Sequence, residues 1–155
     1  MKNKWLILVV LFFTILIGYS FYNFLTKASY NGFYTVSCIK NDKKPVRDYS
    51  FMISISVLGK KYQLPKNLGH QSKQCLNEIY SDNSNGVINV KTNEFKSFTL
   101  GNLFNVLNET FNKDVFLGHK ISNEHTLEVY VNGRKTNMYE NTPLFPNSRI
   151  EIVYK

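Results

Sequence analysis

The sequence has few of the residue types that build metal centres and disulfide scaffolds. It contains two cysteines, three histidines and one tryptophan in 155 residues. Two cysteines are too few for a disulfide-dense scaffold or for a zinc site with four cysteine ligands. The histidines, His70, His119 and His125, lie far apart, and none has the spacing of a His-x-x-x-His ligand pair. We therefore expect no bound cofactor and no zinc-type centre.

Motifs of catalysis are also missing. The chain has no Gly-rich phosphate loop, no Gly-x-Ser-x-Gly nucleophile elbow and no paired-carboxylate pattern. A nucleophile pair of Cys75 with His70 as its base would need an orienting residue and an oxyanion site, and the sequence identifies neither. We therefore predict that the protein is not an enzyme.

Acidic residues are scarce, with 11 against 19 basic residues and a formal net charge of +8. Three of the basic residues, Lys2, Lys4 and Lys27, flank a hydrophobic run, and much of the remaining excess falls between Lys40 and Lys73. Nucleic-acid binding requires a denser basic face with stacking aromatic side chains between the charges. We expect no nucleic-acid partner and interpret the excess as a solvated basic surface, suited to lying over anionic lipid headgroups.

The first part of the chain is a long hydrophobic run. From Trp5 to Tyr22 no residue is charged. Roughly 20 helical residues, each rising 1.5 Å, cross a hydrocarbon core of roughly 30 Å. Trp5 at one end and Tyr19 and Tyr22 at the other are the aromatic types that favour membrane interfaces. The run predicts a single transmembrane helix, with the lipid bilayer as a partner.

Two alternatives to a retained anchor remain open. A cleaved signal peptide would need a small-x-small site, which Phe24 to Ala28 does not offer, and a domain this small can hardly bury an all-apolar helix. More basic groups precede the run than follow it, which favours a cytoplasmic N-terminus. We therefore predict an anchor at 1–27, a linker at 28–32 and an extracytoplasmic domain at 33–155, in a single-pass protein of the cell membrane.

The two cysteines fit this location. An oxidising compartment permits Cys38 and Cys75 to form a disulfide. The bridge would close a loop of roughly 37 residues, worth about 4 kcal/mol on the chain-entropy model. The alternative is two buried thiols that pack as small hydrophobic side chains. The spacing alone does not decide between them.

Periodicity predicts the elements of the domain. Apolar residues alternate from Phe51 to Val57, which is typical of a strand with one buried face. Thr99 precedes an apolar stripe at Leu100, Leu103, Phe104, Leu107 and Phe111, as expected for an N-capped amphipathic helix that faces the core. Further extended segments are predicted at 33–39, 61–64, 86–91, 127–131 and 150–154.

In the region 67–85, a short helix over 72–80 is one interpretation, followed by loop or turn residues at 81–86. One helix with four or five strands in this order indicates an α+β fold rather than α/β. The arrangement expected is β-grasp-like (ubiquitin-like), with a mixed sheet and one main helix; a generic α+β sandwich is the alternative.

Several short motifs resemble those of a family of uncharacterised prokaryotic domains, often membrane-anchored and β-grasp-like. Residues 64–69 (LPKNLG) are similar to the family's IPxNIG element, and Cys75 follows at the expected interval. Residues 86–88 (GVI) match the start of GxIH, 98–101 (FTLG) match FTLG, and 131–133 (VNG) match VNG. The resemblance covers about two thirds of the chain. It implies no established activity.

The chain departs from that family at its histidines. The resemblance implies clusters of the form HxHxH, HTHD and IHVE, which suggest a metal site in the family. Here the corresponding positions hold Asp48, Ser50 and Met52, then 80–83 (YSDN), then 88–91 (INVK). A borderline transition metal needs imidazole or thiolate ligands, so this member lacks the family's ligand set.

Two hypotheses follow. The first is a non-catalytic, membrane-anchored interaction module that binds an envelope protein or the envelope surface, if at a sheet edge then by strand addition. The second is a metal- or small-ligand-handling envelope protein, in which Asp48, Asp82 and Asn83 supply oxygen ligands in place of the lost histidines. Nothing in the sequence indicates the oligomeric state.

Overall fold

The computed structural model describes residues 35–39 and 43–155. The predicted anchor at 1–27, with Trp5, Tyr19 and Tyr22, lies outside the described residues. Within the described ranges, no helix is long and apolar enough to span a bilayer.

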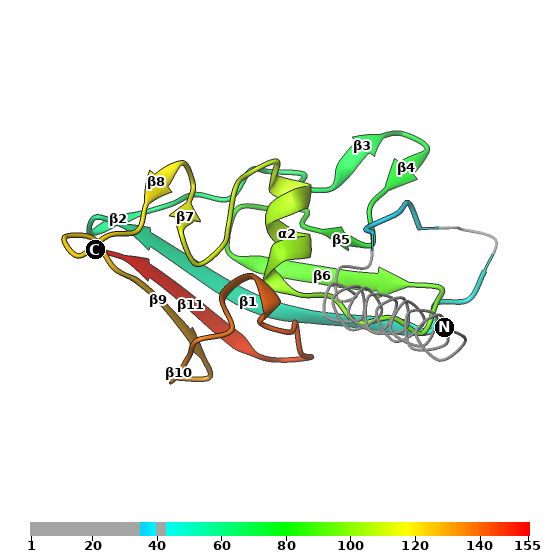
Figure 1. Ribbon diagram of the computed structural model, residues 1–155. Coiled ribbons are helices and arrows are strands. Elements are labelled where there is room, and N and C mark those ends of the chain that lie inside the picture. The colour runs from blue at the N-terminus through cyan, green and yellow to red at the C-terminus, as the bar shows by residue number, and fades with distance from the viewer. Residues whose placement is uncertain (1–34, 40–42) are drawn as a thin grey trace, which may run out of the picture. The chain divides into compact units, whose positions relative to one another are not determined.

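The domain is α+β, with a mixed sheet and one main helix (Figure 1). In the described part of the chain, seven strands form the main sheet in the order β10-β9-β11-β1-β6-β5, with β2 paired to β1. Their bounds are Arg47–Val57 (β1), Lys60–Lys61 (β2), Ile79–Tyr80 (β5), Val87–Thr92 (β6), Leu127–Val131 (β9), Arg134–Thr136 (β10) and Arg149–Tyr154 (β11).

The long strand β1 organises the sheet. It pairs in parallel with the last strand, β11, and antiparallel with β6. Ile53 lies opposite Ile150 and Ile55 opposite Ile152, and all four side chains are buried. The alternation predicted from Phe51 to Val57 is therefore confirmed, because residues two apart on a strand share one face.

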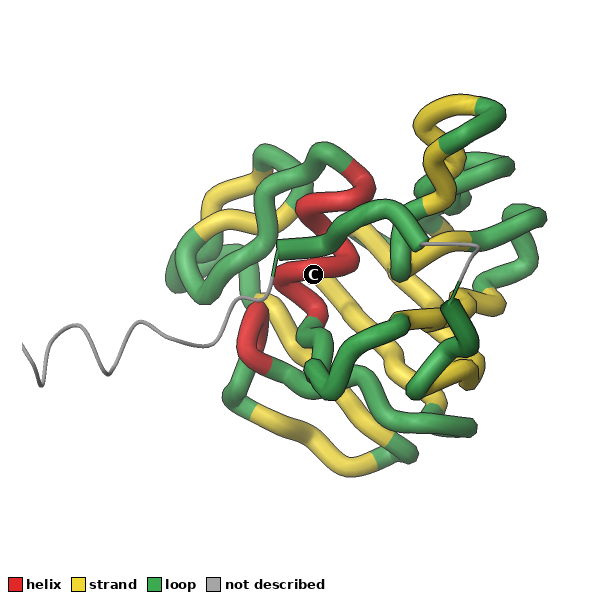
Figure 2. The backbone as a smooth tube through the Cα atoms, turned by 90° about the vertical axis from the view of Figure 1, so that its right-hand side faces the viewer, coloured by secondary structure: helices red, strands yellow, loops and turns green. Residues whose placement is uncertain are grey.

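Helix α2 (Leu100–Leu107) lies across one face of the sheet (Figures 1 and 2). Thr99 is its N-cap as predicted, and the Thr99 N–H donates to Oδ1 of Asn102 at 2.9 Å. Two side chains of this helix, those of Leu103 and Phe104, are buried. The helix ends before Phe111, but that ring still packs on Phe104, with ring centroids 4.5 Å apart.

The structure differs from several smaller expectations. Residues 72–80 form no helix; the region contains β3 (His70–Ser72), β4 (Cys75–Leu76) and β5, because these segments pair with each other and with the sheet. The return strand predicted at 61–64 is limited to β2. In the described part of 33–39, the extended segment makes only an isolated bridge, between Cys38 and Asn77.

The remaining short elements are β7 (Val115–Phe116), β8 (His119–Lys120) and a 3-10 helix, η1 (Tyr139–Asn141). Strands β7 and β8 form a hairpin that seats Phe116 in the core. Phe116 contacts the Phe104 ring, with centroids 5.6 Å apart. The hairpin therefore extends the core beyond the end of α2.

Candidate functional site

The segment 35–39 is fastened to the domain at several points. A disulfide joins Cys38 to Cys75, with Cα atoms 5.1 Å apart. The Ile39 N–H donates to the Leu76 carbonyl at 2.7 Å, and the Glu78 N–H donates to the Ser37 carbonyl at 3.0 Å. Covalent and strand-like contacts together fix the path by which the chain enters the domain.

A buried ion pair adds to this attachment. Nζ of Lys96 lies 2.7 Å from Oε2 of Glu78, and the two side chains are 7% and 4% exposed. Ser37 donates to the same oxygen from its N–H and its hydroxyl, each at 2.9 Å, and the Thr92 hydroxyl donates to Oε1 at 2.6 Å. Burial alone raises the pKa of Glu78, but the hydrogen bonds from Lys96, Thr92 and Ser37 outweigh it and hold the pKa below its usual value.

A cleft of about 520 Å³ lies beside this attachment, within the size range of ligand sites. Three parts of the chain line it: the entering segment, the arm at 69–71 with Asn77, and the polar side of α2. The lining residues are Thr35, Val36, Gly69, His70, Gln71, Asn77, Asn102, Asn105, Val106 and Asn108.

Uncharged amide side chains dominate the cleft. Five of its residues are Asn or Gln, and none is Asp, Glu, Lys or Arg, although the protein carries a net charge of +8. Asn77, one of these residues, is 5% exposed. These carboxamides carry hydrogen-bond donors and acceptors that a polar ligand in the cleft could engage.

His70 lies on the lining of the cleft and contacts Asp82 and Tyr80. Its Nε2 lies 3.2 Å from Oδ1 of Asp82, and its ring makes an edge contact with Tyr80. The sulfur of Cys75 is held in the disulfide. The disulfide therefore leaves no thiol at Cys75 for the nucleophile pair with His70 that the sequence analysis set aside.

The three residues considered as metal ligands have other partners. Oδ2 of Asp48 lies 3.6 Å from Nζ of Lys91, and Asp82 faces His70. Oδ1 of Asn83 accepts the Asn85 N–H at 3.1 Å, which is a turn contact. No group of three or more His, Cys, Asp or Glu side chains able to hold a metal ion occurs in the described ranges.

The pKa of Tyr80 is affected by burial and by two aspartates, Asp48 and Asp82. Burial raises the pKa of its phenol, and the carboxylates of Asp48 and Asp82 raise it further. A phenol with a raised pKa stays protonated at neutral pH. Tyr80 is therefore a neutral phenol at neutral pH.

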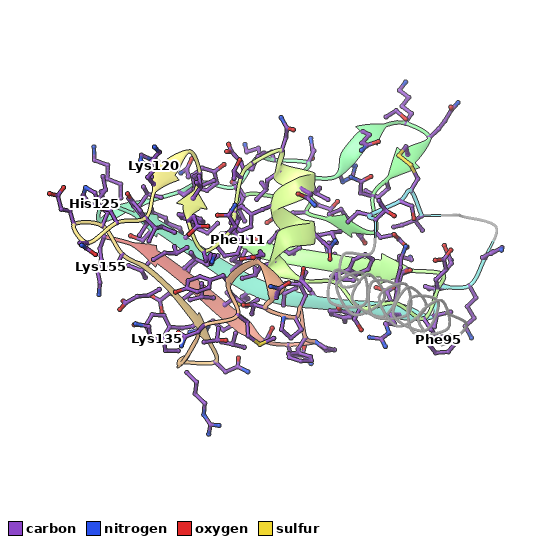
Figure 3. All side chains as sticks on the ribbon, in the orientation of Figure 1. Phe95, Phe111, Lys120, His125, Lys135 and Lys155 are labelled. Carbon is purple, nitrogen blue, oxygen red and sulfur yellow. A yellow bond between two sulfur atoms is a disulfide. The ribbon has the colours of Figure 1, made fainter. Side chains whose placement is uncertain are left out.

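The other two histidines belong to the fold. The rings of His119 and His125 pack on Tyr154, with centroids 5.3 Å and 5.6 Å away. The Tyr154 hydroxyl donates to the Lys120 carbonyl at 2.9 Å. They therefore support the end of the sheet near the C-terminus, where Figure 3 labels His125 and Lys155.

Two glycines, Gly69 and Gly86, lie where another segment of the backbone comes very close. Gly69 has φ +79° and Gly86 has φ +92°, in the left-handed region that favours glycine. A Cβ on Gly69 would collide with the Ile79 carbonyl, and a Cβ on Gly86 would collide with the Ile53 carbonyl. These motif positions thus hold the cleft arm and β6 against the sheet.

Sequence reasoning did not identify the cleft. A signal was present on α2, where Asn102, Asn105 and Asn108 recur every three residues beside the apolar stripe. Thr35 and Asn77, which line the same cleft, come from distant parts of the chain. Their approach depends on the tertiary structure.

Comparison with known proteins supplies no further guide to this site, because no family model, no curated protein and no solved structure matches the chain.

Proposed function

We propose that this chain is a single-pass, membrane-anchored protein whose extracytoplasmic domain is a non-catalytic binding module. The uncharged run from Trp5 to Tyr22, preceded by Lys2 and Lys4, supports the anchor and its orientation. The Cys38–Cys75 disulfide supports an oxidising compartment for the domain. The proposed family relationship, to membrane-anchored domains without known activity, agrees with this location.

The domain is proposed to be β-grasp-like. In support, β1 lies in parallel beside the last strand β11, these two are flanked by β6 and β9, and α2 crosses the sheet. In such a fold the sheet and helix form a rigid frame. Binding residues then lie on the segments around the frame, as the cleft residues do.

The observation that carries the binding role is the concentration of carboxamide side chains in a cleft whose lining has no Asp, Glu, Lys or Arg. An anionic ligand would favour Arg or Lys, and a cation would favour carboxylates; the cleft lining has neither. Each carboxamide offers donors and acceptors together. Neighbouring hydroxyls of a saccharide also donate and accept, so an uncharged glycan of the envelope is the ligand chemistry that fits.

The backbone around the cleft favours this ligand over strand addition by a peptide. The His70 N–H donates to the Asn67 carbonyl, and the Gly69 carbonyl accepts the Asn77 N–H. These groups are already engaged, so a ligand there meets side chains rather than a free strand edge. The alternative metal-handling role would require Asp48 and Asp82 to leave Lys91 and His70, and no observation favours it.

The anchor is tested by fractionating the full chain from expressing cells. We expect it in the membrane fraction, released by detergent but not by high salt or alkaline carbonate, with its disulfided domain open to protease added from outside. Recovery of the unprocessed chain in the soluble fraction without detergent would contradict the anchor.

The binding role is tested by screening the detergent-solubilised full chain on an array of neutral and charged oligosaccharides. We expect neutral glycans to bind, and Asn77→Ala to weaken binding about tenfold, because two neutral hydrogen bonds of about 0.5–1.5 kcal/mol each are lost. Asn123→Ala, an exposed asparagine outside the cleft lining, is the matched control. Binding only to charged glycans, or equal loss in both variants, would refute the assignment.

A further inference from the structure

One end of the domain presents an exposed aromatic ring among basic side chains. Phe95 is 87% exposed and Val46 is 40% exposed. With Lys43, Lys44 and Arg47, all exposed, they form a surface that we call the Phe95 face. Figure 3 shows Phe95 at the end of the domain opposite His125 and Lys155.

The Phe95 face is built from two segments that hydrogen bonds hold together. Nδ2 of Asn93 donates to the Lys43 carbonyl at 2.9 Å, and the Val46 N–H donates to the Thr92 carbonyl at 2.8 Å. Nη1 of Arg47 contacts the Ser97 hydroxyl at 3.5 Å. The loop that carries Phe95 is thus tied on both sides to the basic segment, and the ring is held outward.

The surroundings of the Phe95 face have a positive balance. The acidic side chain within the loop, Glu94, is 67% exposed and lies 3.7 Å from Nζ of Lys96. Asp48, next to Arg47, pairs with Lys91. Lys43, Lys44 and Arg47 have no acidic partner within 4.0 Å in the described ranges. A positive surface with one large apolar side chain is the composition that suits an anionic membrane interface.

The Phe95 face also adjoins the point where the chain enters the domain. Lys96, the neighbour of Phe95, donates from Nζ to the Thr35 carbonyl at 3.5 Å and to the Ser37 hydroxyl at 3.4 Å. The twelve residues 23–34 separate Thr35 from the hydrophobic run. Fully extended, they span at most roughly 40 Å, so the proposed anchor keeps this end of the domain near the bilayer.

We propose that the Phe95 face docks on the anionic lipid headgroups of the membrane that holds the anchor, with the Phe95 ring inserted at the interface. This inference rests on the proposed anchor. Charge complementarity and the short tether select lipid as the occupant over a protein partner. Docking would hold the domain in one orientation on the membrane surface.

The test places a fluorescent reporter at residue 95 of the full chain. Trp5 is the only tryptophan, so Trp5→Phe with Phe95→Trp gives a single emitter on the face. The protein is reconstituted in vesicles of phosphatidylglycerol or of phosphatidylcholine with acyl-brominated lipids. On anionic vesicles we expect a blue-shifted emission and several-fold stronger quenching than on neutral vesicles, and Lys43→Glu with Lys44→Glu abolishes both.

Leu58 supplies the matched control. It is 52% exposed, it lies in the turn that precedes Lys60 and Lys61, and it is at the other end of β1. That strand of 11 residues extends roughly 35 Å. Leu58→Trp in the same Trp5→Phe background tests whether any exposed apolar residue beside lysines is quenched, and we expect a red-shifted, weakly quenched emission.

The outcomes separate the two proposals. A chain that does not float with vesicles refutes the anchor itself. A floating chain in which residue 95 is no better quenched than residue 58 overturns the docking face and leaves the anchor standing. Equal quenching at residue 95 on both lipids, or retention after the charge reversal, overturns the assignment of anionic headgroups; a protein partner would then be the remaining occupant.

Discussion

The two ends of the domain each contain a glutamate bound to lysine, but in opposite settings. At the entry end, Glu78 pairs with Lys96 and both side chains are buried. At the other end, Glu128 lies 2.7 Å from Nζ of Lys155 and 2.9 Å from Nζ of Lys135, both of them exposed lysines (Figure 3). Because the first pair is buried, removing one partner would leave an uncompensated charge in the interior. Solvent screens the second pair, so its contribution to stability is small. The degree of burial therefore decides how much an ion pair contributes to the stability of the domain.

The largest effect is expected from breaking the buried pair. Lys96→Met leaves the Glu78 carboxylate buried without its cation, which costs about 3–5 kcal/mol of unfolding free energy. The measurement is urea unfolding of the full chain in detergent, followed by circular dichroism. The double variant Lys96→Met with Glu78→Gln removes the stranded charge and should recover part of the loss. A loss under about 1 kcal/mol in the single variant would show that water reaches the carboxylate.

The next effect tests the covalent half of the same attachment. Replacing Cys38 and Cys75 by serine frees a loop with a sequence separation of 37 residues, and we expect a loss of about 2–4 kcal/mol. The same unfolding assay measures it. Reduction of the unmutated chain should produce an equal loss, and reduction of the variant should produce none. If the reductant also destabilises the serine variant, which has no disulfide to reduce, the effect of reduction does not come from the Cys38–Cys75 bond.

The smallest effect is expected at the exposed end, and it depends on pH. The hydrogen bonds from Lys155, Lys135 and Tyr130 lower the pKa of Glu128 from 4.5 to about 2. A carboxyl with a depressed folded pKa stabilises fully above its unfolded pKa and loses that contribution as pH falls through the folded value. Glu128→Gln should therefore lower the melting temperature slightly at neutral pH and flatten its decline between about pH 4.5 and pH 2.

Lys135→Met is the control for that pH series, because it removes one of the two lysines and leaves Lys155 in place. We expect its melting temperature at neutral pH to stay close to that of the unmutated chain, since exposed pairs contribute little. High salt should reduce whatever difference remains. A large loss, or one that salt leaves unchanged, would mean that this end resembles the buried end after all.

The elements that sequence reasoning predicted are those with a regular local period. The alternation from Phe51 to Val57 became β1, and the stripe that follows Thr99 became α2. Both periods arise from backbone geometry within one segment, so neighbours in sequence suffice to reveal them. Phe111 marks the boundary, because it continues the stripe by spacing but lies after the helix has ended.

The region 67–85 resisted prediction for a physical reason. Its strands are two or three residues long and its turns depend on Asn67 and Gly69 with positive φ. Such short pieces have no period of their own. They are extended because β5 pairs with β6 and because Cys75 is tied to Cys38, and both partners lie elsewhere in the chain.

Residues a few positions apart suffice to reveal the local properties: the uncharged run at 5–22, the buried face of β1 and the apolar stripe of α2. Three other features depend on how the chain packs: Glu78 pairs with Lys96, Cys38 bonds to Cys75, and Asn77 lines a cleft beside α2. Those contacts join residues from separate segments, and their proximity follows from the way the sheet, the helix and the entering chain pack together.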